Sequence, residues 1–203
     1  APLSIVALAI SSVESETPNF TEVEEVVSEL FTILQFEFHL RNEHETYLKR
    51  ALEVLSSHRL IEYNKEESES IKVTRIGEQS ILQLAGLLSV FFEAYRHTLE
   101  MTLILDKGPE LESSIQKMAL QQGEKLVLEG KIRRAEAISK LTVQNATRML
   151  IRTKILERVE GGQLSLGEQG KEGRDKMINR MTSLLNTVDR PYAMSVRPHP
   201  AQN

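Results

Sequence analysis

Apolar residues are densest between Ile81 and Leu105, and this stretch dominates the pattern of the chain. It holds 16 apolar residues in 25, no proline and one glycine. The apolar positions fall on nearly every side of a 3.6-residue helix, which is typical of a helix inside a protein. Its uncharged part, residues 79–92, is 14 residues long, whereas a membrane span needs about 20. The pattern predicts a buried central helix over 78–105, with an interfacial helix as the alternative.

Helical spacing also governs the chain up to residue 57. Residues 2–10 are short and apolar, and a docked helix is favoured over a buried strand. Thr21 and Glu24 have the spacing of a capping box, so a helix is predicted from there to about Leu40. A second helix is predicted over about 42–57, with Leu48, Ala51, Leu52 and Leu55 pointing inward.

The spacing changes from helical to alternating at two places, and each predicts a β-hairpin. In the first, residues 60–63 and 71–74 flank a polar, acidic stretch. In the second, residues 155–159 and 164–166 flank a turn with two glycines. Alternation is typical of half-exposed strands. Two helices followed by a hairpin is the order of elements in a winged-helix unit.

The remaining chain is predicted to be helical up to its tail. A helix over 110–129 ends at Gly130. Two short helices follow over 133–141 and 142–154, and a last one over 172–188. The end of the chain has three prolines and no pattern, so residues 191–203 are expected to be disordered. The predicted fold is mainly α, with winged-helix-like units at 1–77 and 106–190 around the central helix.

A loose internal repeat supports two tandem units. Five positions in and after the second helix recur 95 residues later, and three positions in and after the first hairpin recur 93 residues later. The pairs are Ala51/Ala146, Leu55/Leu150, Leu60/Ile155, Ile61/Leu156, Glu62/Glu157, Ile71/Leu164, Val73/Leu166 and Gly77/Gly170. Convergence on one helix-and-hairpin pattern would look the same, so common descent does not follow.

Composition narrows the function classes. The net charge of −4 disfavours nucleic-acid binding by the chain as a whole. The absence of cysteine excludes disulfides, thiolate zinc sites and cysteine nucleophiles. The chain starts at Ala1 on an apolar run with no basic region before it, unlike a signal peptide. This start is interpreted as a cut in a longer sequence.

No catalytic motif stands out, and neither a cofactor nor a metal ligand set is predicted. Glu93, His97 and Glu100 share one helical face, but a metal or acid–base site would need a further group from elsewhere. The polar stripe of a mostly buried helix is the preferred interpretation of this trio. P-loop, GxGxxG and GxSxG motifs are missing from the sequence.

The strongest charge feature is basic. Residues 131–158 carry eight Lys and Arg against two acids. Asn145, Arg148 and Arg152 are expected on one helical face. Such a face could read DNA, meet phospholipid head groups, contact an acidic domain, or be merely solvated. The residues expected to contact an anionic surface are Lys131, Arg133, Arg134, Arg148 and Arg152.

Three segments together resemble a known family. They are ELFTILQFEFHLRNEHETYLKRALEVLSSHRLIEY (29–63), LLSVFFEAYRHTLEMTLIL (87–105) and EGKIRRAEAISKLTVQNATRML (129–150). They are similar to the region C-terminal to the catalytic domain in the large glycerol-3-phosphate acyltransferases and their dihydroxyacetone-phosphate relatives. Residues 1–10 also resemble the segment that follows the acyltransferase domain there. The likeness covers roughly 1–190 and is a succession of helical patterns without a catalytic signature.

The resemblance implies a supporting role in phospholipid biosynthesis. The parent enzyme would transfer an acyl group from acyl-CoA or acyl-ACP to glycerol 3-phosphate, at the cytoplasmic side of a membrane. The family's chemistry depends on a histidine followed five residues later by aspartate, and none of the five histidines here has that partner. The chain alone is therefore expected to be non-catalytic. Its expected partners are the catalytic domain of the same protein and a membrane surface, with nucleic acid disfavoured. The alternative function is a tandem winged-helix module that binds nucleic acid or protein.

Overall fold

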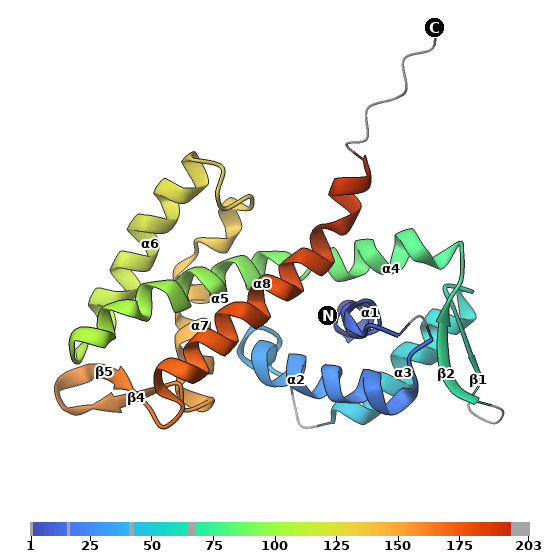
Figure 1. The fold of residues 1–203 in the computed structure, drawn as a ribbon, viewed down its shortest axis with the longest axis horizontal. Coiled ribbons are helices and arrows are strands. Elements are labelled where there is room, and N and C mark those ends of the chain that lie inside the picture. Colours follow the sequence, from blue (N-terminus) through green and yellow to red (C-terminus); the bar gives the residue numbers. More distant parts are fainter. Residues whose placement is uncertain (1, 16, 41–42, 65–67, 196–203) are drawn as a thin grey trace, which may run out of the picture. The chain divides into compact units, whose positions relative to one another are not determined.

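The structure is a computed structural model, and it describes residues 2–15, 17–40, 43–64 and 68–195. The described chain is mainly helical (Figure 1), which confirms the predicted fold class. Contacts divide it into two compact units. Unit 1 comprises residues 1–30, 42–89 and 184–203, and unit 2 comprises residues 31–41 and 90–183.

Unit 1 has a largely apolar helix at its centre. In α1 (Pro2–Ser12) the side chains from Ile5 to Ala9 are completely buried. The helix packs against α3 (His44–Ser57) and α4 (Gly77–Gly86), as Figure 1 shows. A helix that is apolar on every side is stable only when neighbours cover every side. The short run at the start of the chain is therefore a helix, as predicted.

The capping box of α2 (Phe20–Phe38) lies two residues earlier than predicted. The amide of Glu22 donates to Asn19 Oδ1 at 2.9 Å, and the amide of Asn19 donates to Glu22 Oε2 at 2.8 Å. The prediction that Thr21 and Glu24 form the capping box was wrong. Asn19 and Glu22 have the same spacing, so the spacing alone could not distinguish the two pairs. Asparagine is the better N-cap residue, and choosing it adds Phe20 to the helix.

The first predicted hairpin is confirmed. β1 (Ile61–Asn64) and β2 (Ser68–Val73) pair antiparallel, with Ile61 opposite Val73 and Tyr63 opposite Ile71. The Ile71 amide donates to the carbonyl of Pro18 at 2.7 Å, so the segment before α2 lies along the outer edge of β2.

Unit 2 contains the second hairpin, also as predicted. Its elements are α5 (Ser89–Met101), the 3₁₀ helix η1 (Thr102–Lys107), β3 (Glu110–Leu111), α6 (Glu112–Leu128), η2 (Ala135–Ala137), α7 (Lys140–Arg152), β4 (Leu156–Val159), η3 (Glu160–Gly162) and β5 (Gln163–Leu166). The strands form an antiparallel sheet in the order β3-β5-β4. In Figure 1 the β4–β5 hairpin follows directly from α7. α8 (Gly170–Ser195) begins in this unit.

The prediction of one long central helix over 78–105 is wrong. α4 ends at Gly86, α5 begins at Ser89, and the chain tightens into η1 from Thr102. The Ser89 hydroxyl donates to the carbonyl of Gly86 at 2.5 Å, which is a local side-chain bond that competes with helix continuation. Leu87, at the break, is 65% exposed. The apolar stretch is therefore two helices, of which α4 belongs to unit 1 and nearly all of α5 to unit 2.

Two other predicted boundaries need correction. A helix over 133–141 does not form, because Ser139 caps α7 by accepting from the Thr142 amide at 3.1 Å and only η2 precedes it. α8 continues to Ser195, so the predicted disordered tail begins too early. The rest of that tail lies outside the described residues.

The sequence repeat has structural counterparts in the two units. Arg59 and Lys154 each follow the last turn of a helix with φ of 58°. The next residues, Leu60 and Ile155, donate their amides to carbonyls five residues back, as in a left-handed helix cap. The hairpins then start in the same register, Ile61 opposite Val73 and Leu156 opposite Leu166. The winged-helix classification of the units stays a prediction.

Candidate anion-binding surfaces

The basic face of α7 consists of Arg148 and Arg152. Both side chains are exposed, and their spacing of four residues puts them one above the other on the helix. Asn145, three residues before Arg148 and seven before Arg152, lies on the same side of the helix, but it is 2% exposed and adds nothing to the exposed basic surface. On the helical wheel Asn145 lies between the two exposed arginines and the buried Met149 and Ala146, so it is at the border of the buried side of α7.

Asn145 connects Arg148 to a half-buried carboxyl group, that of Glu37. Arg148 Nη1 donates to Asn145 Oδ1 at 3.3 Å, and the Asn145 side chain also bonds Glu37 on α2. The Tyr95 hydroxyl donates to Glu37 Oε1 at 3.0 Å. Burial raises the pKa of Glu37, while the hydrogen bonds from Asn145 and Tyr95 oppose the rise. These contacts link the exposed Arg148 on α7, through Asn145, to Glu37 on α2.

Two of the other predicted contact residues are engaged within unit 2. Arg134 Nη1 donates to the buried Glu93 at 3.2 Å, and the amides of Arg133 and Arg134 also donate to this carboxylate. Lys131 pairs with Glu129 at 2.8 Å. Lys131 and Arg134 therefore have acidic partners, and Arg148 and Arg152 are the better candidates for an external anion.

The helical trio with His97 does not form a site. Glu93 binds the segment at residues 133–134 as above, Glu100 pairs with Arg96, and His97 Nε2 lies 2.8 Å from the carbonyl of Ala119. Among the described residues, no group of three or more His, Asp or Glu side chains is placed to hold a metal ion. The polar-stripe interpretation is the one that these contacts support.

Sequence reasoning missed an ion pair between a buried arginine and an exposed aspartate. Arg174 on α8 is 2% exposed and donates from Nη1 and Nη2 to Asp106, at 2.8 and 3.2 Å. The Arg174 bond holds the pKa of Asp106 below its ordinary value. The partners lie 68 residues apart, and no local pattern in the sequence connects them.

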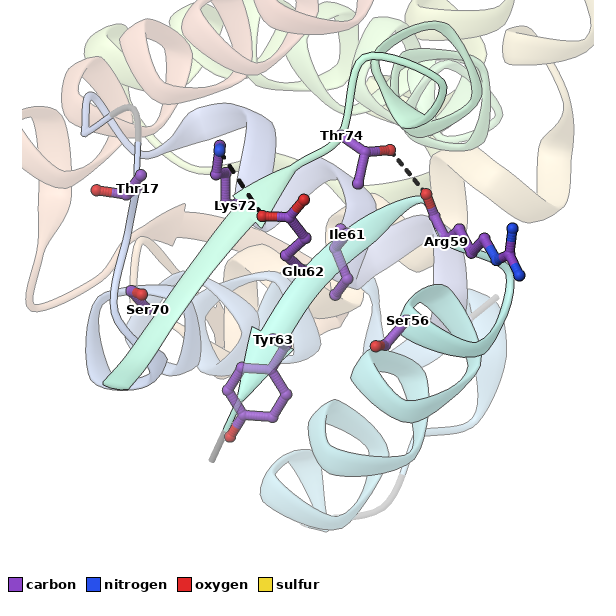
Figure 2. A pocket seen from close by; sticks show the side chains of 9 residues that line it. All are labelled: Thr17, Ser56, Arg59, Ile61, Glu62, Tyr63, Ser70, Lys72 and Thr74. Carbon is purple, nitrogen blue, oxygen red and sulfur yellow. Dashed lines mark hydrogen bonds and ion pairs between the residues drawn. The ribbon is translucent and has the colours of Figure 1, made fainter. Parts of the chain in front are cut away.

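A polar hollow in unit 1 was also missed. It has a volume of about 680 Å³ and lies along the β1–β2 hairpin and the end of α3, and Figure 2 shows the side chains that line it. Five of its nine lining residues carry hydroxyl groups and two are basic. Lys72 Nζ lies 3.7 Å from Glu62 Oε2, and the Thr74 hydroxyl donates to the carbonyl of Arg59 at 2.7 Å. The lining residues are Thr17, Ser56, Arg59, Ile61, Glu62, Tyr63, Ser70, Lys72 and Thr74.

Unit 2 has a smaller hollow of about 260 Å³ at the matching place. Ile151, Lys154, Leu156, Glu157 and Arg158 line it, and each lies 95 positions after a residue that lines the hollow of unit 1. The hollow is thus a product of the repeated helix-and-hairpin architecture. Such a feature appears only once the fold is known.

A comparison with models of protein families shows which family the chain belongs to. The model of the glycerol-3-phosphate acyltransferase C-terminal region matches residues 1–159. The chain belongs to this family. The match covers most of the chain and includes the three segments on which the resemblance rested.

No curated protein matches the chain significantly. Within the described part of this acyltransferase C-terminal region, no helix combines the length and apolarity that crossing a bilayer requires.

Proposed function

We propose that the chain is a non-catalytic supporting module of a membrane-associated glycerol-3-phosphate acyltransferase. It braces the catalytic domain of the same protein and contacts an anionic membrane surface. The family match carries this proposal. The absence of a histidine–aspartate pair of the required spacing supports the non-catalytic role, since activating an acceptor hydroxyl needs a general base worth typically about 10²–10⁴-fold in rate.

The membrane contact is assigned to Arg148 and Arg152 on α7. Both are exposed, and Arg148 is held by Asn145. An exposed basic residue near an anionic leaflet contributes about 1 kcal/mol. The attraction fades within a Debye length, about 8 Å at physiological salt.

Vesicle co-flotation tests this role. The chain should bind vesicles with anionic lipids more than neutral vesicles, and high salt and the double variant Arg148→Glu/Arg152→Glu should both reduce binding. A matched charge reversal on α3, Lys49→Glu/Arg50→Glu, should leave binding close to that of the unchanged chain. Binding that ignores salt and the α7 variant would refute the lipid contact.

A separate assay tests the non-catalytic role. The purified chain should transfer no acyl group from acyl-CoA or acyl-ACP to glycerol 3-phosphate. Turnover that persists after repeated purification would refute this half of the proposal and leave the lipid contact open.

A nucleic-acid module is the second candidate function. The observation that favours it is the β4–β5 hairpin directly after α7, a helix with exposed arginines. The net charge of −4 weighs against it. Tight, sequence-selective binding of duplex DNA in a gel-shift assay, lost in the α7 double variant, would favour this candidate over the membrane contact.

A further inference from the structure

The hollows of units 1 and 2 share their construction but not their charge. Arg59 corresponds to Lys154, and Thr74 to Gly167. In unit 2, Lys154 pairs with Glu168 at 2.5 Å and Arg158 pairs with Glu112 at 3.2 Å. These pairs neutralise the cations of the smaller hollow. Both cations of the unit 2 hollow thus have an acidic partner at 3.2 Å or less, which makes this hollow an internal reference for a ligand-binding test.

The cations of unit 1 are not neutralised in this way. Arg75 stands 93 positions before Glu168, so the matching site has the opposite charge. Within the described residues, the guanidinium of Arg59 has no acidic partner. The pair of Lys72 with Glu62 is long, 3.7 Å, and both side chains are mostly exposed. Such a pair contributes little, so Lys72 can exchange this partner for a ligand at small cost.

Hydroxyl groups surround these cations. Ser56 takes the place that the apolar Ile151 has in unit 2. Figure 2 shows Ser56 and Tyr63 on the α3 side of the hairpin, and Thr17 beyond β2. Thr74 already donates to Arg59 and is a poorer donor for a ligand. Hydroxyl donors with Lys and Arg make the donor set that oxyanions accept from, and charge-assisted bonds of this kind are the strong ones.

We propose that the hollow of unit 1 binds the dianion of a phosphate monoester. Lys72 is the main cationic contact, with hydroxyl groups of the lining as further donors. Figure 2 shows the Arg59 guanidinium directed away from the hairpin, so this exposed side chain must rotate to reach the anion. Glu62 opposes binding, since its carboxylate competes with the phosphate for the ammonium group of Lys72. This site is separate from the proposed membrane contact of α7.

The test is an NMR titration of the whole chain with inorganic phosphate and methyl phosphate at pH 7.5 and constant ionic strength. Saturable shifts are expected at Ser56, Lys72 and Thr74, with an affinity in the millimolar range because the hollow is open. Lys72→Gln and Arg59→Gln should each weaken binding about 3- to 10-fold. Glu62→Gln should tighten it, by about 3-fold, because the competing carboxylate is removed.

Two controls make the outcome specific. Arg50→Gln, exposed on α3 outside the lining, and Lys154→Gln in the unit 2 hollow should leave the affinity unchanged. Shifts that grow linearly without saturation, equal shifts with chloride, or the same loss in Arg50→Gln as in Lys72→Gln would overturn the proposal.

Vesicles with phosphatidic acid separate the two sources of a phosphate monoester. Binding that falls in Lys72→Gln but not in the α7 double variant would assign the hollow to a lipid head group. Saturable phosphate binding without such vesicle binding would assign it to a soluble ligand. If neither phosphate nor vesicles with phosphatidic acid bind at the hollow, the proposed site is wrong. The membrane contact of α7 is tested separately, by the Arg148→Glu/Arg152→Glu variant.

Discussion

At the scale of single residues, burial separates neighbours that the sequence makes look alike. Leu87 and Leu88 are adjacent leucines in the most apolar stretch of the chain, yet Leu87 is 65% exposed and Leu88 is 1% exposed. The break between α4 and α5 turns one of them outward. The same holds for Asn145, whose polar side chain points inward to Glu37. Sequence periodicity fails at such sites because it shows neither where a helix breaks nor which neighbouring element covers a polar side chain.

The leucine pair gives a direct test. Leu88→Asp should destabilise unit 1 by several kcal/mol, because it buries an unpaired carboxylate, and this approaches the whole stability of a domain, about 5–15 kcal/mol. Leu87→Asp, one residue earlier, should change the free energy of unfolding little. Chemical denaturation measures both, and equal losses in the two variants would contradict the break at this position.

The Asp106–Arg174 pair predicts a pH dependence. The pKa of Asp106 is lowered in the folded chain by the Arg174 hydrogen bond. The stabilisation is therefore fully present above the unfolded value, about 3.9, and is lost as the pH falls through the folded value. Asp106→Asn should be less stable than the unchanged chain at pH 7, and the difference should vanish in acid.

Denaturation curves at several pH values measure this difference. The matched control is Glu124→Gln, an exposed carboxylate on α6, which should track the unchanged chain throughout. A constant gap between Asp106→Asn and the unchanged chain down to strongly acidic pH would show that the loss is not electrostatic.

At the scale of elements, the sequence predicted well which segments form helices and strands. It predicted poorly the residues at which they begin and end. Both hairpins were predictable, since Ile61, Ile71 and Leu164 alternate with polar residues and the strands do pair. The first strand of the unit 2 sheet, β3, has two residues and is too short to show alternation. The capping box was placed two residues late because Asn19 and Thr21 have the same spacing to an acid. The hollow of unit 1 draws on four separate segments, and no sequence window contains it.

The junction between the first hairpin and α4 depends on a glycine. A Cβ atom at Gly77 would lie 1.9 Å from the carbonyl oxygen of Leu60, which is backbone and cannot move aside cheaply. Gly77→Ala should therefore cost about 1–3 kcal/mol of stability and disturb the β1–β2 pairing. Gly86→Ala, whose nearest contact is 4.0 Å away, is the matched control. Thermal melts of both variants measure the effect, and equal melting temperatures would contradict the close approach.

At the scale of the whole molecule, α2 and α8 each begin in one unit and end in the other. The end of α8 supplies buried residues, among them Leu184, Leu185 and Val188, to unit 1. The sequence alone suggested a simple tandem order, because a periodic pattern does not reveal which unit covers each turn of a helix. Family membership was visible in the sequence, since it depends on the succession of segments and not on their packing.

A substitution in the last turns of α8 should therefore destabilise unit 1. Val188→Asp should speed amide hydrogen exchange in α1 and α4, because it places a charge among the buried residues of unit 1. Asn186→Asp, exposed on the same helix, should leave exchange unchanged. Faster exchange confined to α6 and α7 would show that this part of α8 does not belong to unit 1.

The crossing of the chain between units has a consequence for fragment complementation. A cut after Leu87, whose side chain is 65% exposed, produces pieces 1–87 and 88–203. Of the described residues, 31–40 in the first piece belong to unit 2, and 184–195 in the second piece belong to unit 1. Each unit then needs both pieces, so the nicked protein should stay together on a sizing column. Neither half, expressed alone, should fold.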